Sequence, residues 1–317
     1  MKKKLRIVFM GTPDFAVANL KALIDDQQNI IGVITAPDKP AGRGKKIQQS
    51  AIKRYAVEQN LNILQPTNLK DENFLLDLKN LNADLQIVVA FRMLPEKVWD
   101  MPELGTFNLH ASLLPQYRGA APINWAIING EKATGVTTFF LQHEIDTGNI
   151  IFQEKVQITD DMDAEDLHDQ LMDLGAKLVV ETVHQIENTN IITKPQKNFN
   201  KNDLKAAPKI FKADCKINWD QSIVTIHNHI RGLSPYPTAW TRLNNKSLKI
   251  FKGKKELIHH SNKIGTIVTD HKTFLKITVK EGYYSLLELQ LEGKKRMNIE
   301  NFLRGFQNQK DIKFVLE

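Results

Sequence analysis

The chain contains little of what secreted and membrane proteins need. Cys215 is the single cysteine among 317 residues, which excludes an intrachain disulfide and is typical of a reducing cytoplasm. It lies in a lysine-rich region without a neighbouring base, so we interpret it as a structural cysteine. No apolar run approaches the roughly 18 residues of a membrane helix. The basic start is followed by only a short apolar stretch, residues 5–10, so a first strand is expected instead of a signal peptide. We expect a cytoplasmic protein.

The sequence also lacks a metal-binding pattern. Its nine histidines show no spacing with cysteine or acidic residues of the kind that metal sites use. We predict that no metal is bound. Nothing in the sequence resembles an oligomerisation stripe, so a monomer is expected.

Charge is distributed unevenly along a chain of otherwise ordinary composition. With 42% hydrophobic and 25% charged residues, it is a typical globular protein, and its length predicts about two domains. Residues 1–190 carry 19 basic and 25 acidic side chains, net −6, whereas residues 191–317 carry 24 and 11, net +13. This asymmetry favours a polyanionic partner for the C-terminal half. A lysine-rich surface that serves only solubility is the alternative.

The N-terminal part alternates strand-like and helix-like segments, which predicts βαβ units and an α/β, Rossmann-like domain over residues 1–189. The strand-like runs are rich in Ile, Val and Leu without alternation, as buried parallel strands are. Asp163 is a candidate N-cap for a long helix whose leucines recur at three- and four-residue steps. Strands are expected at residues 5–10, 30–35, 85–90 and 106–109, and helices at 14–24, 51–59, 72–81, after Pro122 and at 163–186.

The C-terminal part predicts a different domain. Residues 190–213 are basic, contain two prolines and show no period, which is typical of a linker. Residues 214–317 then show a helical segment and short strands separated by turn residues, which predicts a small β-barrel. The helix is expected at 222–230 and the strands at 248–251, 265–268, 274–279 and 286–291.

Three polar side chains offer a catalytic combination. The sequence FNLHASLLPQYRGAAPI at 107–123 contains Asn108 and His110, and Asp146 begins a DTG triplet further on. Because Asn108 and His110 end a predicted parallel strand, they belong to the sheet edge where ligands bind. The amide can donate to an oxyanion, the imidazole can move protons, and the carboxylate can orient the imidazole. Taken singly, each could be an ordinary turn or hydrogen-bonding residue.

These motifs resemble the folate-dependent formyltransferases. The 108–123 block and the downstream DTG carry the likeness, and segments 9–16, 36–46 and 289–305 narrow it to the members that act on methionyl-tRNA. The resemblance implies a Rossmann-like catalytic domain, a C-terminal OB-like barrel, and 10-formyltetrahydrofolate as formyl donor. It further implies that the acceptor is initiator methionyl-tRNA, giving N-formylmethionyl-tRNA for translation initiation.

The resemblance also implies roles for individual residues. Asn108, His110 and Asp146 correspond to the catalytic trio, in which Asn108 donates to the oxyanion and His110 stabilises it or relays the proton of the attacking amine. The family closes Ser112, Leu113, Leu114 and Pro115 around the folate, and Phe91 and Met93 are expected to line the pterin pocket. This sequence departs from the family pattern there, because Phe91-Arg92 replaces a tyrosine-glycine pair and the stretch before Leu94 is one residue short.

Basic residues in two places are candidate tRNA contacts. The segment DKPAGRGKK at 38–46 is too cationic and glycine-rich for a core, and the family uses it as an arm that enters the acceptor end of tRNA. A solvated surface loop is the plain alternative, and the segment lacks P-loop spacing. The candidates are Lys39, Arg43, Lys45 and Lys46 on the arm, and Lys254 and Lys294 on the barrel.

Two other functions remain open at this point. An amino-sugar nucleotide formyltransferase of the same family would share the SLLP segment and a C-terminal extension, but it would not need the basic arm. A noncatalytic RNA-binding protein on the same scaffold would be expected to have lost part of the trio, whereas Asn108, His110 and Asp146 are intact.

Overall fold

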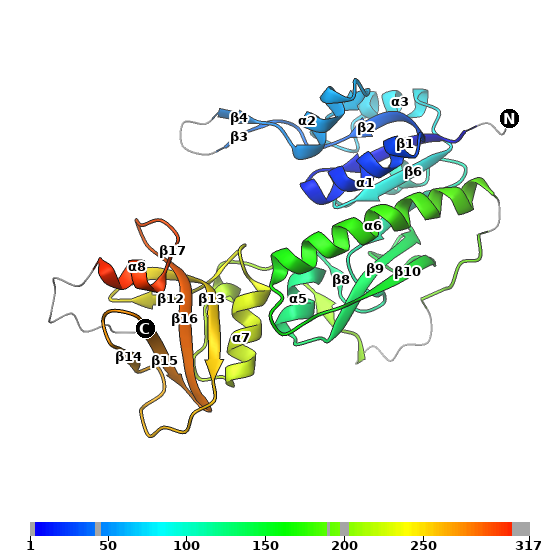
Figure 1. The fold of residues 1–317 in the computed structure, drawn as a ribbon. Coiled ribbons are helices and arrows are strands. Elements are labelled where there is room, and N and C mark those ends of the chain that lie inside the picture. Colours follow the sequence, from blue (N-terminus) through cyan, green and yellow to red (C-terminus); the bar gives the residue numbers. More distant parts are fainter. Residues whose placement is uncertain (1–3, 42–45, 189–190, 197–202, 306–317) are drawn as a thin grey trace. The chain divides into compact units, whose positions relative to one another are not determined.

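Contacts divide the chain into two compact units, each described here by itself. The computed structural model describes residues 4–41, 46–188, 191–196 and 203–305. The N-terminal unit comprises Met1–Gly119, Thr134–Val156 and His168–Ala206, and the C-terminal unit comprises Ala120–Ala133, Gln157–Leu167 and Ala207–Glu317. Figure 1 shows the elements of both units. The domain boundaries expected from the sequence, 1–189, 190–213 and 214–317, remain a prediction about which parts fold alone.

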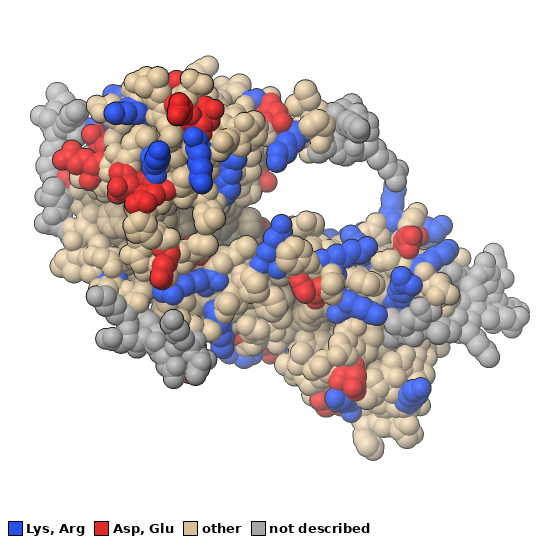
Figure 2. All heavy atoms as spheres, turned by 180° about the vertical axis from the view of Figure 1, so that it is seen from behind, with Lys and Arg blue, Asp and Glu red and all other residues tan. Residues whose placement is uncertain are grey.

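The surfaces of the two units differ in charge. Figure 2 shows acidic and basic side chains mixed over the N-terminal unit, and mainly basic ones over the C-terminal unit, on the face it presents. Within the described ranges, none of the helices is long and apolar enough to cross a membrane. The same residues contain no group of three or more His, Cys, Asp or Glu side chains placed to hold a metal ion.

A seven-stranded sheet organises the N-terminal unit. Its order is β10-β9-β7-β6-β1-β2-β5, with parallel pairing from β7 through β6, β1 and β2 to β5 and antiparallel pairing between β7 and β9. The predicted α/β, Rossmann-like fold is confirmed. The strands are β1 (Arg6–Gly11), β2 (Asn29–Ile34), β5 (Ile63–Leu64), β6 (Leu85–Val89), β7 (Thr106–His110), β9 (Ala133–Phe140) and β10 (Ile150–Gln157).

Helices connect the parallel strands as predicted. The helices predicted at 14–24, 51–59 and 72–81 agree with the observed ones to within one residue at each end. Two of them have N-cap residues next to them in the sequence: the side chain of Ser50 accepts the N–H of Lys53, and that of Asp71 accepts the N–H of Phe74. The helices of this part of the chain are α1 (Asp14–Asp25), α2 (Ala51–Glu58), α3 (Glu72–Asn80), α4 (Glu96–Trp99) and α6 (Ala164–Glu187).

The long helix α6 begins where the sequence predicts. Asp163 Oδ1 accepts the N–H groups of Glu165 and Asp166 at 2.9 and 3.1 Å, which satisfies two donors of the first turn. Gly175 brings this helix close to the sheet, since a Cβ there would lie 2.6 Å from Leu109 Cδ2. The helix therefore covers the face of β7 to which Leu109 points.

Two short two-stranded sheets accompany the large one. The first is a hairpin of β3 (Lys39–Ala41) and β4 (Lys46–Gln48), paired antiparallel, within the segment expected as a basic arm. The second pairs β8 (Arg118–Gly119) with β11 (Ala206–Ala207).

An antiparallel sheet forms the C-terminal unit, which confirms the predicted β-domain. Its order is β12-β13-β16-β15-β14, with β17 on β16. Register shifts at Ile250–Gly253 interrupt the pairing of β13 with β16, and such bulges bend a strand. The sequence missed β12 and the full length of β13. The strands are β12 (Ala239–Leu243), β13 (Lys246–Glu256), β14 (Ile267–Thr269), β15 (Leu275–Val279), β16 (Gly282–Leu291) and β17 (Met297–Asn298).

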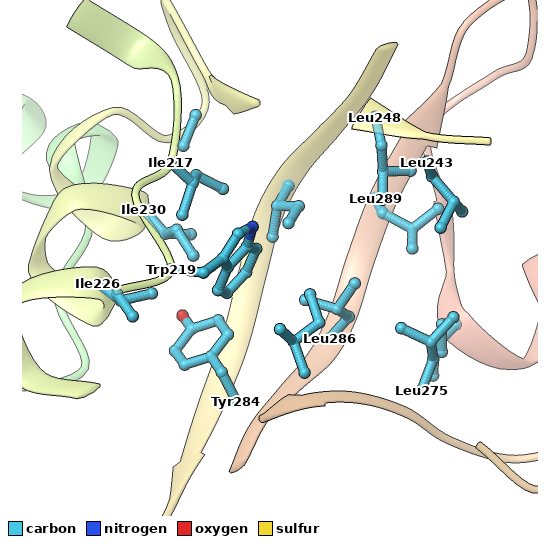
Figure 3. Close-up of a cluster of buried hydrophobic side chains, with 14 of the residues drawn as sticks. Ile217, Trp219, Ile226, Ile230, Leu243, Leu248, Leu275, Tyr284, Leu286 and Leu289 are labelled. Carbon is cyan, nitrogen blue, oxygen red and sulfur yellow. The ribbon is translucent and has the colours of Figure 1, made fainter. Parts of the chain in front are cut away.

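The core of this unit lies between α7 and the sheet. Figure 3 shows Trp219 and Tyr284 surrounded by aliphatic side chains, and their ring centroids lie 6.2 Å apart. Burial raises the pKa of Tyr284, whose hydroxyl lies 3.2 Å from His227 Nδ1. Cys215 is buried and donates to the carbonyl of Phe211, which agrees with its interpretation as structural. The helices here are α5 (Pro122–Ile128), η2 (Ala213–Cys215), α7 (Ile223–Gly232) and α8 (Ile299–Arg304).

Candidate active site

Strand β7 places Asn108 and His110 together. Side chains two residues apart on a strand point to the same face, so these two project away from the face of Leu109 that α6 covers. The strand lies between β6, where Val88 pairs with Asn108, and β9, where Thr137 pairs with His110. The amide of Asn108 is half-buried and forms no side-chain hydrogen bond with any described residue. It is therefore available to a ligand at the carboxyl end of the strand.

The imidazole of His110 is oriented by backbone. Its Nε2 lies 2.8 Å from the carbonyl oxygen of Tyr117, and because a carbonyl only accepts, Nε2 carries the hydrogen. The other nitrogen, Nδ1, faces Asp146 Oδ2 at 3.9 Å. His110 is 7% exposed. Nδ1, on the side of the carboxylate, is therefore the ring nitrogen available to a ligand.

Asp146 reaches the site from the loop between β9 and β10. Its Oδ2 accepts the N–H of Gly119 at 3.0 Å, which fixes the carboxylate beside His110. The residue has a φ of +54°, the left-handed region. Two residues on, Gly148 lies so close to β9 that a Cβ would come within 1.6 Å of the Phe140 carbonyl oxygen. Only glycine allows the backbone to approach β9 this closely, which explains the glycine of the DTG triplet.

Two residues that were not predicted from the sequence hold this loop. Gln196 Nε2 donates to the carbonyls of Asp146 and Gly148 at 3.0 and 2.8 Å. Arg118 Nη2 donates to Gln196 Oε1 at 2.7 Å. Burial lowers the pKa of Arg118, opposed by the carboxylates of Asp146 and Glu144. Because Gln196 lies in a segment with the composition of a linker, no local signal marks it.

The predicted folate segment is held rigidly next to His110. Ser112 is fully buried, and its hydroxyl donates to the carbonyl of Gln116 at 2.6 Å. Leu114 is fixed through its backbone: its N–H donates to Thr137 Oγ1, and its carbonyl accepts from Gln153 Nε2 at 2.8 Å. Leu114 and Pro115 are buried and Leu113 is half-buried.

The second predicted folate segment follows β6. Phe91 is half-buried and packs against the cluster that contains Val88, whereas Met93 is 75% exposed. Arg92 donates to the carbonyls of Pro66 and Thr67 and lies 5.7 Å from the centre of the Phe91 ring. The bulky Arg92 thus anchors this loop where the family pattern has glycine.

Two loops at this edge present exposed apolar side chains. Ile145, next to Asp146, is 62% exposed, and Met93 lies on the loop after β6. His143, on the loop of Ile145, lies 3.4 Å from Glu96 of α4, which follows the loop of Met93, and its ring also meets that of Trp99 in the same helix. Exposed apolar side chains on these loops would suit a ligand with a flat ring.

The arm is anchored at its base. Asp38 accepts from Lys53 Nζ at 2.5 Å and from Gln65 Nε2 at 2.8 Å, and these hydrogen bonds lower the pKa of Asp38. Lys39 is exposed on β3. Lys46 belongs to β4, but its side chain, like the whole of Arg43 and Lys45, lies outside the described residues.

The predicted contacts on the C-terminal sheet are accessible. Lys254 is exposed on β13 and Lys294 is exposed after β16. Arg296 differs from them, because its guanidinium pairs with Glu288 at 2.7 Å and lies 4.2 Å from the centre of the Phe251 ring. Lys254 and Lys294 belong to the C-terminal unit, whereas Asn108, His110 and Asp146 belong to the N-terminal unit.

Comparison with known proteins defines the class. The sequence profile of formyl transferase matches residues 5–183, and that of the formyl transferase C-terminal domain matches residues 209–307. The chain belongs to the formyl transferase family and is a formyl-transferring enzyme.

Several relatives that align along nearly the whole chain are named methionyl-tRNA formyltransferase. The protein of Parabacteroides distasonis is 57% identical over 313 residues, which cover 96% of this chain and 97% of the relative. That of Bacteroides thetaiotaomicron is 56% identical over 311 residues, again 96% and 97%.

Solved structures with lower identity share the fold. WlaRD, a sugar 3N-formyl transferase, matches with a TM-score of 0.64 at 24% identity, covering 92% of this chain and 100% of its own. HypX from Aquifex aeolicus, solved in complex with tetrahydrofolic acid, matches with a TM-score of 0.65 at 15% identity over 98% of this chain and 50% of its own.

Proposed function

We propose that this chain transfers the formyl group of 10-formyltetrahydrofolate to the amino group of initiator methionyl-tRNA, giving N-formylmethionyl-tRNA. The observation that carries the proposal is the identity of 57% over 96% of the chain to a methionyl-tRNA formyltransferase. That similarity includes the C-terminal unit and the basic arm, and it accompanies an intact Asn108, His110 and Asp146.

Each residue of the trio has a separate role in the transfer. Asn108, whose amide has no hydrogen-bond partner among the described residues, donates its N–H to the formyl oxygen as negative charge develops there. His110, whose Nε2 is occupied by Tyr117, accepts the proton of the attacking amine at Nδ1 or stabilises the developing charge there. Asp146, 3.9 Å away, stabilises the imidazolium that results. As the oxyanion collapses, the bond from the formyl carbon to the folate nitrogen would break, and the proton would pass to that nitrogen so that tetrahydrofolate leaves.

The donor site is built from the two loops after β6 and β7. When bound, 10-formyltetrahydrofolate supplies an activated formyl group. Ser112, Leu113, Leu114 and Pro115 would hold it from one segment, and Phe91 and Met93 from the other. The buried backbone of Leu114 and the exposed Met93 fit this role, since one gives a fixed wall and the other a side chain that a ring can cover.

The acceptor is recognised by charge outside the catalytic pocket. Lys39, Arg43, Lys45 and Lys46 on the arm would approach the acceptor end, and Lys254 and Lys294 would meet phosphates. The net charge of +13 in residues 191–317 supports a polyanionic acceptor. The enzyme would act as a cytoplasmic monomer, and the trio supplies the chemistry without a metal ion.

The test offers labelled 10-formyltetrahydrofolate with initiator methionyl-tRNA, elongator methionyl-tRNA and an amino-sugar nucleotide in parallel. We expect label on the initiator tRNA, less on the elongator, and none on the sugar. Label on the sugar alone would overturn the proposal while leaving the chemistry of the trio in place.

A further inference from the structure

The segment that follows α6 forms hydrogen bonds with the loops of the candidate active site. Residues 191–206 have the composition of a linker, yet the described residues 191–196 and 203–206 belong to the N-terminal unit. Lys194 and Ile150 exchange both backbone hydrogen bonds at 2.8 Å, which fixes the first stretch along β10. The second stretch is fixed at Lys205, whose carbonyl accepts the N–H of Tyr117 at 2.6 Å.

These two attachments support the two halves of the catalytic pair. Tyr117, held by Lys205, provides the carbonyl that accepts His110 Nε2. Gln196 holds the other half, because its amide donates to the carbonyls on both sides of Thr147, within the loop that carries Asp146. The segment thus binds the backbone that orients His110 and the backbone that presents Asp146.

Gln196 closes a ring of hydrogen bonds. Its Oε1 accepts from Arg118 Nε at 3.3 Å and Nη2 at 2.7 Å, and the next residue, Gly119, donates its N–H to Asp146 Oδ2 at 3.0 Å. The loop of Asp146 and the loop of Tyr117 are therefore tied to each other twice, once directly and once through Gln196. Asp146 itself sits in the left-handed region, a conformation that needs support from its surroundings.

We propose that Gln196 is a positioning residue for formyl transfer, an inference that rests on the proposed function. It acts through Asp146 and Arg118 and touches neither substrate. Without its two donated hydrogen bonds, the 146–148 loop loses its side-chain attachment to the 191–196 stretch, and the carboxylate shifts from Nδ1 of His110. A displacement of about 1 Å at a catalytic group is sufficient to reduce turnover by up to about 100-fold.

The test compares Gln196→Ala and Gln196→Glu with the unaltered chain. Glutamate still accepts from Arg118 but cannot donate to the two carbonyls, so it separates the two kinds of contact. Gln28→Ala is the matched control, because Gln28 also donates its side-chain amide, to Asp26 Oδ2 in the turn after α1. Each protein is assayed with the acceptor that the unaltered chain formylates best, over a range of pH and of both substrates.

We expect kcat to fall by about 10- to 100-fold in both Gln196 variants, as misplacement of a catalytic group does, with less than about 3-fold change in either KM. The pH profile of kcat should also move, and amide exchange at Gly119 should accelerate. Unchanged kcat in Gln196→Glu, or a loss confined to the KM of the acceptor, would overturn the inference. An unaltered chain that formylates only an amino-sugar nucleotide would overturn the proposed acceptor alone, since the Gln196 comparison is then made on that sugar.

Discussion

At the residue scale, the active site depends on what each polar atom already binds. In His110, Nε2 is hydrogen-bonded to a backbone carbonyl, which leaves Nδ1 for the proposed chemistry. The amide of Asn108 has no hydrogen-bond partner among the described residues. Asp146 lies beyond hydrogen-bond distance of Nδ1, at 3.9 Å, so in the proposed mechanism it would act on the imidazole through charge more than through a direct bond.

Replacing His110 removes the proton-accepting nitrogen. In His110→Ala we expect kcat at saturating substrates to fall by at least about 100-fold, the scale of a lost acid-base or oxyanion group. His259→Ala, which truncates an exposed histidine of the C-terminal unit, is the control and should keep its rate. A His110 variant with near-normal kcat would exclude the imidazole from the mechanism.

A second histidine, His229, should make the stability of the folded chain decrease in acid. Burial lowers the pKa of His229 from its ordinary 6.5, and its Nε2 is buried without a hydrogen-bond partner among the described residues. Below pH 6.5 the unfolded chain therefore binds a proton that the folded chain does not, so this residue reduces stability as pH falls. The urea midpoint of the unaltered chain should fall more between pH 7.5 and about pH 5 than that of His229→Gln. Equal falls would show that other groups cause the acid sensitivity.

At the scale of elements, α6 has an N-terminus that its own sequence specifies. Asp163 accepts two N–H groups of the first turn, so Asp163→Ala should cost about 1 kcal/mol of unfolding free energy, within the range of N-cap removals. Asp173→Ala changes an exposed aspartate in the same helix and should be nearly neutral. Urea unfolding measures both, and equal effects would contradict the capping role.

The arm is an element with a fixed base. Asp38 is held by Lys53 and Gln65, and strands β3 and β4 pair over three residues each. Ile47 on β4 is 71% exposed. Under the proposed function, the exposed Lys39 of this paired stem would meet phosphate, and Ile47 would offer an apolar contact.

At the scale of the whole molecule, charge should govern use of the proposed tRNA substrate. Two phosphate contacts alone would raise the KM for tRNA about 10-fold between 50 and 200 mM salt through counterion binding, whereas the KM for the folate should change little. Arg43→Ala should raise the tRNA KM and flatten its salt dependence. A folate KM that rises in this variant would show that the arm assignment is wrong.

Much of the fold could be predicted because it is locally encoded. Buried parallel strands are runs of Ile, Val and Leu, and caps such as Asp163 lie beside the turns they satisfy. Strands β9 and β10 were missed. In β9, Thr137 and Thr138 are fully buried, and their hydroxyls pair with Leu114, Phe152 and Thr182 on other segments, which no local pattern indicates.

The sequence by itself determined the uneven charge, and it was enough to predict the fold class and the candidate trio of Asn108, His110 and Asp146, since each depends on residue types and near neighbours. Only the tertiary structure decided which nitrogen of His110 remains for chemistry and that Gln196 and Arg118 hold Asp146 in place. Gln196 lies 50 residues from Asp146 along the chain. A hydrogen bond across that distance leaves no periodicity or local motif, because folding alone brings its two ends together.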